Sequence, residues 1–161
     1  MYWTTAGPDL AGTKNATVMK APLGGGPSTK LAGGADVVDP AGIAVDTTDV
    51  YWVNTGVGVK SGSVMKVPIG GGTPTVIEAK ADIPFAIALD EANIYWTNTS
   101  VNGGTTLNKK PKCGGCTTIL AKTGQFYGLA VDATHVYCGN QTDPNSTPIY
   151  RVETLFKVPK D

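Results

Sequence analysis

The chain has 161 residues, and its 13 Lys and Arg residues balance its 13 Asp and Glu residues. This length is enough for the core of one ordinary domain, and the lack of net charge or of like-charge runs argues against nucleic acid or an acidic membrane surface as a partner. The sequence has no stretch close to the ~20 apolar residues of a membrane-spanning helix, and we expect no signal peptide at its start.

The composition favours short strands joined by turns. The chain contains 21 Gly and 11 Pro, which are turn residues. It is also rich in Thr and Val, which favour strands, whereas Glu, Arg and Gln are scarce. We therefore expect an all-β protein.

A Tyr-Trp pair recurs along the chain after 49, 44 and 42 residues, with Cys in place of Trp in the last copy. An Asp stands five residues before each of the last three tyrosines. Self-similarity at a period of roughly 20 to 50 residues is typical of propellers and solenoids. The residues that we assign to this structural repeat are Tyr2, Trp3, Tyr51, Trp52, Tyr95, Trp96 and Tyr137, with Asp46, Asp90 and Asp132.

In chain order, the repeats cover approximately residues 1–37, 38–82, 83–124 and 125–161, which together form a single repeat domain. The second repeat contains four segments with the pattern of short strands, which we name A to D. They are "GIAVD" (42–46), "VYWVN" (50–54), "SVMKVPI" (63–69) and "PTVIEA" (74–79).

The first repeat starts at segment B and the last one stops at segment C, so the sequence predicts fourteen strands. Four antiparallel strands in about 44 residues are typical of a β-propeller blade. We therefore expect an all-β chain of about 3.5 propeller-type blades, which is either a partial propeller or one that self-association completes. We expect the A strands to lie near a central axis and to be buried on both faces.

Tyr and Trp of segment B are adjacent, so they lie on opposite faces of a strand. We expect one ring to pack against the next blade and the other against the previous blade. The repeated aspartates fall at the turn between segments A and B, where a carboxylate can accept hydrogen bonds from backbone N–H groups.

The motifs "YWTT", "YWVN" and "YWTN" resemble the YWTD repeats of low-density-lipoprotein-receptor propellers and the blades of related bacterial secreted proteins. This resemblance implies a propeller fold and a secreted or cell-surface parent protein. The sequence departs from the motif at its fourth letter, where Thr5, Asn54, Asn98 and Asn140 replace Asp. The turn can survive this change, but the charge is lost.

Two cysteines, Cys113 and Cys116, flank a Gly-Gly turn at the position of the other Gly-rich turns. A disulfide across this turn is the interpretation that we favour if the chain meets an oxidising compartment. Free thiols, a metal site and a redox centre are the alternatives. His135 and Cys138 are the weak candidates for the further ligands that zinc would need, and a polar turn residue is the simpler interpretation of His135.

Our leading functional hypothesis is a noncatalytic binding module that recognises a protein or carbohydrate through loops at one end of the blades, with no cofactor. Because the flat sides of the terminal blades would be exposed, we also expect self-association, as a homodimer or a larger oligomer. The rival hypothesis is a hydrolase, lactonase-like or active on glycosides, for which calcium is the ion left open. Its weak candidate residues are the loop carboxylates Asp9, Asp82 and Asp143. A fragment without activity of its own is a third hypothesis.

Overall fold

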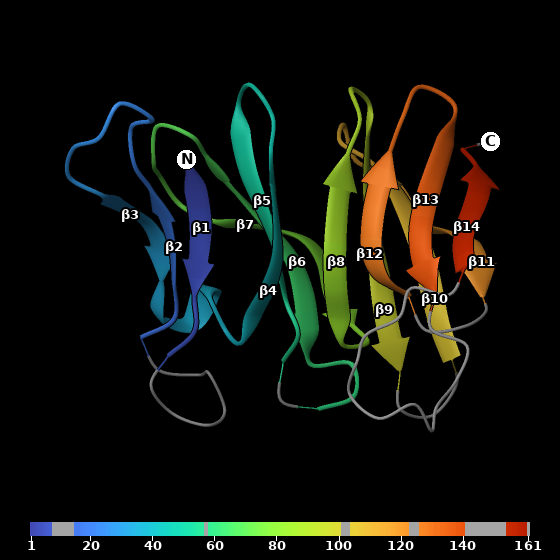
Figure 1. Ribbon diagram of the computed structural model, residues 1–161. Coiled ribbons are helices and arrows are strands. Elements are labelled where there is room, and N and C mark those ends of the chain that lie inside the picture. Colours follow the sequence, from blue (N-terminus) through green and yellow to red (C-terminus); the bar gives the residue numbers. More distant parts are fainter. Residues whose placement is uncertain (8–14, 57, 101–103, 123–125, 141–153, 161) are drawn as a thin grey trace. The chain divides into compact units, whose positions relative to one another are not determined.

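In the described residues, the regular secondary structure of the computed structural model is almost entirely β strand, and the chain forms two compact units, Met1–Pro84 and Phe85–Asp161. Each unit is described by itself (Figure 1). The residues that the structure describes are 1–7, 15–56, 58–100, 104–122, 126–140 and 154–160.

Unit 1 contains two antiparallel sheets, with the strand orders β1-β2-β3 and β4-β5-β6-β7. We name these sheets blade 1 and blade 2. Neighbours in each sheet are also neighbours in sequence, which is the up-and-down order of a propeller blade. The elements are β1 (Tyr2–Thr5), β2 (Thr17–Lys20), β3 (Thr29–Gly33), the short 3-10 helix η1 (Gly34–Asp36), β4 (Pro40–Val45), β5 (Asp49–Asn54), β6 (Gly62–Pro68) and β7 (Thr75–Ala81).

Unit 2 contains blade 3, with the order β8-β9-β10-β11, and blade 4, with the order β12-β13-β14. The described residues thus form fourteen strands in propeller-type blades, and the fold class that the repeats predict is confirmed. The strands are β8 (Pro84–Leu89), β9 (Asn93–Ser100), β10 (Gly104–Pro111), β11 (Thr118–Lys122), β12 (Phe126–Val131), β13 (His135–Asn140) and β14 (Thr154–Pro159).

Strand A of blade 2 differs from the expectation that the A strands are buried on both faces. Most of β4 is half-buried, and Val45 is exposed. Strands β5 and β6 supply the most buried residues of this blade. β4 lies at the edge of its sheet, whereas the B and C strands lie inside it. The edge strand β8 of blade 3 is more deeply buried, with Pro84, Ile87 and Ala88 inside, so the edge position alone does not set the exposure of an A strand.

A layer of apolar side chains, which we call a seam, joins the two sheets of unit 1. From blade 1 the seam takes the buried Val18 and the partly buried Tyr2, and from blade 2 it takes Trp52 and Met65. The tyrosine side of blade 1 therefore packs against the tryptophan side of blade 2. Each large apolar side chain that is fully buried contributes roughly 1.5–3 kcal/mol to the stability of the fold.

The seam of unit 2 follows the same rule. Tyr95 and Leu107 come from blade 3, and Val136 and Cys138 come from blade 4. Cys138 stands where blade 2 has the much larger Trp52. Phe126, which is fully buried in the same seam, occupies the strand position that Pro40 has in blade 2, since both residues pair with the Asn that ends strand B. We infer that the larger Phe126 fills the space left by the smaller Cys138.

The Gly-rich turns between strands C and D also repeat. Gly25, Gly71 and Gly114 have φ angles of 88°, 94° and 101°, a region that favours glycine. Each of them donates its N–H to the carbonyl of the proline three residues earlier, over 3.3, 2.9 and 3.1 Å. These segments are hairpin turns.

Asn54 connects strand B of blade 2 to the segment that precedes this blade. Its Oδ1 accepts hydrogen bonds from Trp52 Nε1 and Val38 N, both at 3.1 Å. Its Nδ2 donates to the carbonyl of Asp36 at 3.1 Å and to Ser63 Oγ at 3.0 Å. Asn54, the last residue of the segment "VYWVN", is thus a fully bonded polar group beside the seam.

We expect Asn54→Ala to lower the free energy of unfolding by roughly 2–3 kcal/mol, because Trp52 Nε1 loses its partner in a buried place and two part-buried backbone groups lose theirs. Urea denaturation followed by tryptophan fluorescence measures this change. Asn98→Ala is the matched control, since Asn98 Oδ1 is buried without a hydrogen-bond partner. It should cost less than about 1 kcal/mol, and equal losses in the two variants would contradict the role of Asn54.

Candidate functional site

The three repeated aspartates hold the turns between strands A and B. Asp46 Oδ1 accepts the N–H groups of Thr48 and Asp49 at 2.9 and 2.8 Å. The same two bonds occur at Asp90, from the second and third residues after it, at 2.9 and 2.7 Å. They occur again at Asp132, at 2.7 and 2.8 Å. In each turn the carboxylate replaces backbone acceptors that the tight bend cannot supply.

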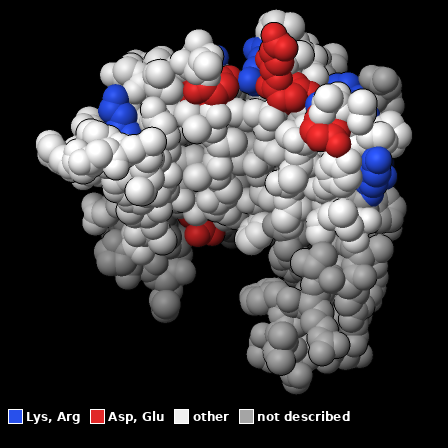
Figure 2. All heavy atoms as spheres, turned by 45° about the horizontal axis from the view of Figure 1, so that its top comes forward, with Lys and Arg blue, Asp and Glu red and all other residues white. Residues whose placement is uncertain are grey.

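Each of these turns lies beside the end of strand C of its own blade. In unit 2, Lys112 N donates to the carbonyl of Ala92 at 2.8 Å, and Lys160 N donates to that of Thr134 at 3.2 Å. The A–B turns and the ends of the C strands therefore share one end of the unit, which we call the turn end. In the view of Figure 2, acidic and basic side chains gather along the end that comes forward.

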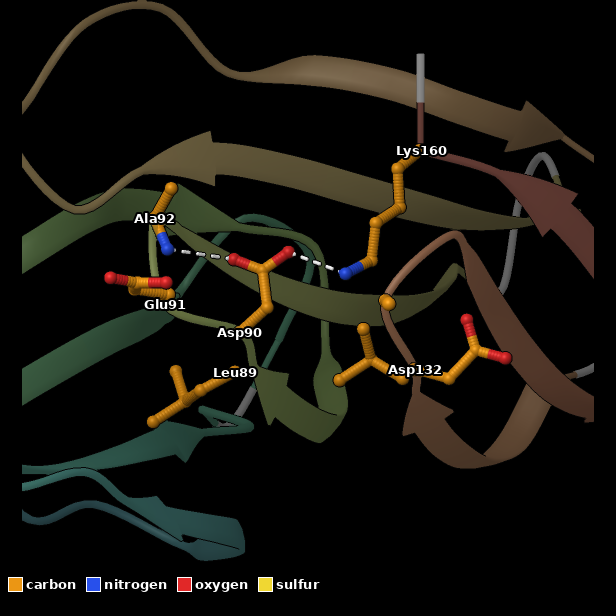
Figure 3. Close-up of a pocket in the computed structure, with 8 residues that line it drawn as sticks. Leu89, Asp90, Glu91, Ala92, Asp132 and Lys160 are labelled. Atoms are coloured by element: carbon orange, nitrogen blue, oxygen red, sulfur yellow. Dashed lines mark hydrogen bonds and ion pairs between the residues drawn. The ribbon is translucent and has the colours of Figure 1, made fainter.

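A pocket of about 460 Å³ opens at the turn end of unit 2, between the β8–β9 turn, the β12–β13 turn and the residue after β14 (Figure 3). We call it the turn-end pocket. It combines apolar residues at the strand ends with three carboxylates and one ammonium group. Its lining residues are Leu89, Asp90, Glu91, Ala92, Val131, Asp132, Ala133 and Lys160.

Asp90 and Lys160 form the ion pair of the turn-end pocket. Lys160 Nζ lies 2.7 Å from Asp90 Oδ2, and both side chains are largely buried. The Tyr95 hydroxyl donates to the same oxygen at 2.8 Å, and the Lys160 ammonium lies 5.7 Å from the centre of the Tyr95 ring. Burial raises the pKa of the Asp90 carboxyl, but the hydrogen bonds from Lys160, Tyr95 and the turn amides outweigh this effect and lower the pKa to about 2.

Asp132 has the same local geometry as Asp90, but its environment is different. Its Oδ2 accepts the Tyr137 hydroxyl at 2.6 Å, and its carboxylate points away from Lys160 in Figure 3. The hydrogen bond from Tyr137, followed by those from the turn, holds the pKa of the Asp132 carboxyl well below its usual range. The same bond raises the pKa of the Tyr137 hydroxyl. Asp132 is thus an exposed, ionised carboxylate, and so is a source of negative potential.

Cys113 and Cys116 are exposed in the C–D turn of blade 3, and both carry free thiols in the structure. The disulfide between them stays a prediction. Cys138 is also a free thiol but is fully buried in the seam of unit 2, and burial raises the pKa of this thiol to about 11.

The structure does not bring His135 and Cys138 together. They are three residues apart on β13, so they point to opposite faces of the sheet. His135 Nδ1 lies 2.7 Å from Thr134 Oγ1, whereas Cys138 belongs to the seam. Within the part of the chain that the structure describes, no group of three or more His, Cys, Asp or Glu side chains is placed to hold a metal ion.

Of the candidate catalytic carboxylates, Asp9 and Asp143 lie outside the described residues. Asp82 belongs to unit 1, where it is half-buried in the segment that follows β7. Its Oδ1 accepts a backbone hydrogen bond from Lys60 at 3.4 Å. The pairing of two loop carboxylates that the hydrolase hypothesis requires therefore stays a prediction.

Sequence reasoning missed Lys160 and Glu91, which complete the turn-end pocket. The repeat carried no clear signal for Lys160. This residue follows the proline of the C-strand motif, where blades 1 and 2 have Leu23 and Ile69 but blade 3 also has a lysine, Lys112. The position of its partner Asp90 in the neighbouring blade could not be read from the repeat.

No protein-family model and no curated protein matches the chain. Among solved structures, it is similar to a chain in a crystal structure of a nidogen/laminin complex, with 17% sequence identity and a TM-score of 0.41. That match covers 90% of this chain and 75% of the other. Among the described residues, no helix has the length and apolar character needed to cross a membrane.

We expect the ion pair of Asp90 to make the fold sensitive to acid. The folded-state pKa of about 2 lies below the ordinary value of 3.8, so the ionised carboxylate stabilises the fold above pH 3.8, and this contribution is lost as the pH falls towards 2. Thermal denaturation across this range should show a steeper loss for the wild type than for Asp90→Asn. Glu91→Gln removes an exposed carboxylate of the same turn and should keep the wild-type profile. Parallel profiles for Asp90→Asn and the wild type would contradict the assignment.

In the reduced chain, the exposed and the buried cysteines should differ in how fast their thiols react. We expect Cys113 and Cys116 to react with an aromatic disulfide reagent under native conditions, because a thiol must be accessible and ionised to attack. Cys138 should react only after unfolding. Absorbance of the released thiolate counts the thiols, and mass spectrometry of the air-oxidised chain tests the disulfide through the loss of two hydrogens. Reaction of all three native thiols at one rate would contradict the burial of Cys138.

Proposed function

We propose that the protein is a noncatalytic interaction module that binds a protein partner through the turn end of unit 2. The observation that carries this proposal is the turn-end pocket, in which Asp90 and Lys160 are held in place and two more carboxylates are exposed. A rigid scaffold that presents fixed charges at one end is suited to recognition, since little ordering is needed on binding.

The charges of the pocket favour a basic group of the partner. The pocket is lined by three carboxylates, those of Asp90, Glu91 and Asp132, and by one ammonium group, which Asp90 already neutralises. The remaining negative potential attracts a Lys or Arg side chain and gives a neutral sugar no comparable gain. The sequence left open whether the ligand is a protein or a carbohydrate, and the charges of the pocket support a protein.

The location of the parent protein is part of the same proposal. We propose a secreted or cell-surface protein, as the resemblance to YWTD repeats implies, and an oxidising compartment would then allow Cys113 and Cys116 to form their disulfide.

We expect an acetylated, amidated lysine to shift the amide resonances of Ala92 and Ala133 in a saturable way in an NMR titration of the whole chain. Glu91→Gln should weaken this binding roughly threefold, because it removes one exposed charge from the pocket. Asp82→Asn, the same change of charge outside the pocket, should bind as the wild type does. A methyl glycoside that shifts the same amides more strongly than lysine would contradict the proposal of a protein partner, and so would equal binding by Glu91→Gln and the wild type.

The hydrolase alternative has no observation in its favour among the described residues. It is tested by a lactonase and glycosidase screen of the chain with and without calcium. Turnover that Asp82→Asn abolishes would overturn the noncatalytic proposal.

A further inference from the structure

The seams of units 1 and 2 define two kinds of sheet face. The leading face of a blade carries the Tyr of strand B, the first apolar residue of the C-strand motif and the lysine two positions later, and within each unit the leading face of the first blade packs on the second blade. In blade 3 these residues are Tyr95, Leu107 and Lys109, and Lys109 pairs with Tyr95 in the register of β9 and β10. In blade 1 they are Tyr2, Val18 and Lys20.

The trailing face packs on the previous blade. In blade 2 it carries Trp52, Met65 and Val67, and Trp52 pairs directly with Met65 in the register of β5 and β6. All three side chains are buried.

The leading face of blade 4 has the same residues as the other leading faces but is uncovered. Tyr137 pairs with Lys157 in the register of β13 and β14, and Leu155 lies on the same face. Leu155 is 64% exposed, whereas its counterparts Val18 and Leu107 are both 0% exposed. The apolar side chain at this position is thus buried in blades 1 and 3 but open to solvent in blade 4.

The trailing face of blade 1 is the complementary case. Trp3 pairs directly with Met19, as Trp52 pairs with Met65. Both Trp3 and Met19 are only half-buried, whereas Trp52 and Met65 are 0% and 4% exposed. Trp3 and Met19 are therefore the uncovered equivalents of Trp52 and Met65, which the leading face of blade 1 covers within unit 1.

A polar contact crosses each seam at a fixed place. Lys20 Nζ donates to the carbonyl of Ile69 at 2.7 Å, and Lys109 Nζ donates to that of Lys160. On the uncovered leading face, the equivalent lysine is Lys157, which is exposed and lies 5.7 Å from the centre of the Tyr137 ring. The equivalent acceptor on blade 1 is the carbonyl of Leu23, a residue that is 88% exposed.

We propose that the chain binds a second copy of itself head to tail, with the leading face of blade 4 on the trailing face of blade 1 of the other copy. Tyr137 and Leu155 then cover Trp3 and Met19, and Lys157 donates to the carbonyl of Leu23. The contact is heterologous, since two different faces meet, so each copy keeps one face free unless the assembly closes. It does not depend on the turn-end pocket.

Size-exclusion chromatography with light scattering at micromolar concentration tests the contact. The wild type should elute as a dimer or a larger assembly. Leu155→Asp and Trp3→Asp should each weaken association at least about tenfold, because each places a carboxylate in an apolar seam. An equimolar mixture of the two variants should form a heterodimer, since one variant keeps the leading face and the other keeps the trailing face. Ile119→Asp, at another exposed apolar residue of unit 2, should associate as the wild type does.

Far-UV circular dichroism checks that the variants are folded, and Met19→Glu replaces Trp3→Asp if that variant unfolds. A monomeric wild type at micromolar concentration would overturn the proposal. Full association of Leu155→Asp would also overturn it, and so would a mixture of folded variants that stays monomeric, because an isologous contact would not be restored by mixing.

Discussion

The packing of one sheet on the next through the seam is the interaction on which the rest of the structure depends. A twisted sheet of three or four short strands has two apolar faces and cannot bury both of them alone. In each unit, the tyrosine side of one blade and the tryptophan side of the next share a single core, as Tyr2 with Trp52 and Tyr95 with Cys138 show. The stable element is therefore the pair of blades and not the single blade.

The polar features of unit 2 follow from the same packing. The seam places the A–B turn of blade 3 beside the end of strand C of blade 4, and this neighbourhood lets Lys160 reach Asp90. The contact of Lys109 with the carbonyl of Lys160 depends on the same alignment of the two sheets. Recognition at the turn end, as we propose it, uses groups that the scaffold has already fixed in place.

Much of the fold could be predicted because the information was local and repeated. Fourteen strands in their order follow from the recurrence of four short patterns, and alternation along a strand puts Tyr51 and Trp52 on opposite faces. The same alternation separates His135 from Cys138 in β13, but this could not be read from the sequence, because the repeat pattern favours a polar turn residue at His135 and not a residue of the strand. The ion pair of Asp90 with Lys160 and the half-exposed state of β4 could not be predicted, because they depend on how neighbouring sheets align.

Side chains from two sheets form one energetic core, and a double-mutant cycle across the seam of unit 2 tests this most directly. Leu107→Ala in blade 3 and Val136→Ala in blade 4 each remove buried methyl groups from the same cluster. In urea denaturation, the account predicts a coupling free energy of at least about 0.5 kcal/mol between the two substitutions, as is typical of residues in contact. Effects that add without such coupling would contradict a shared core.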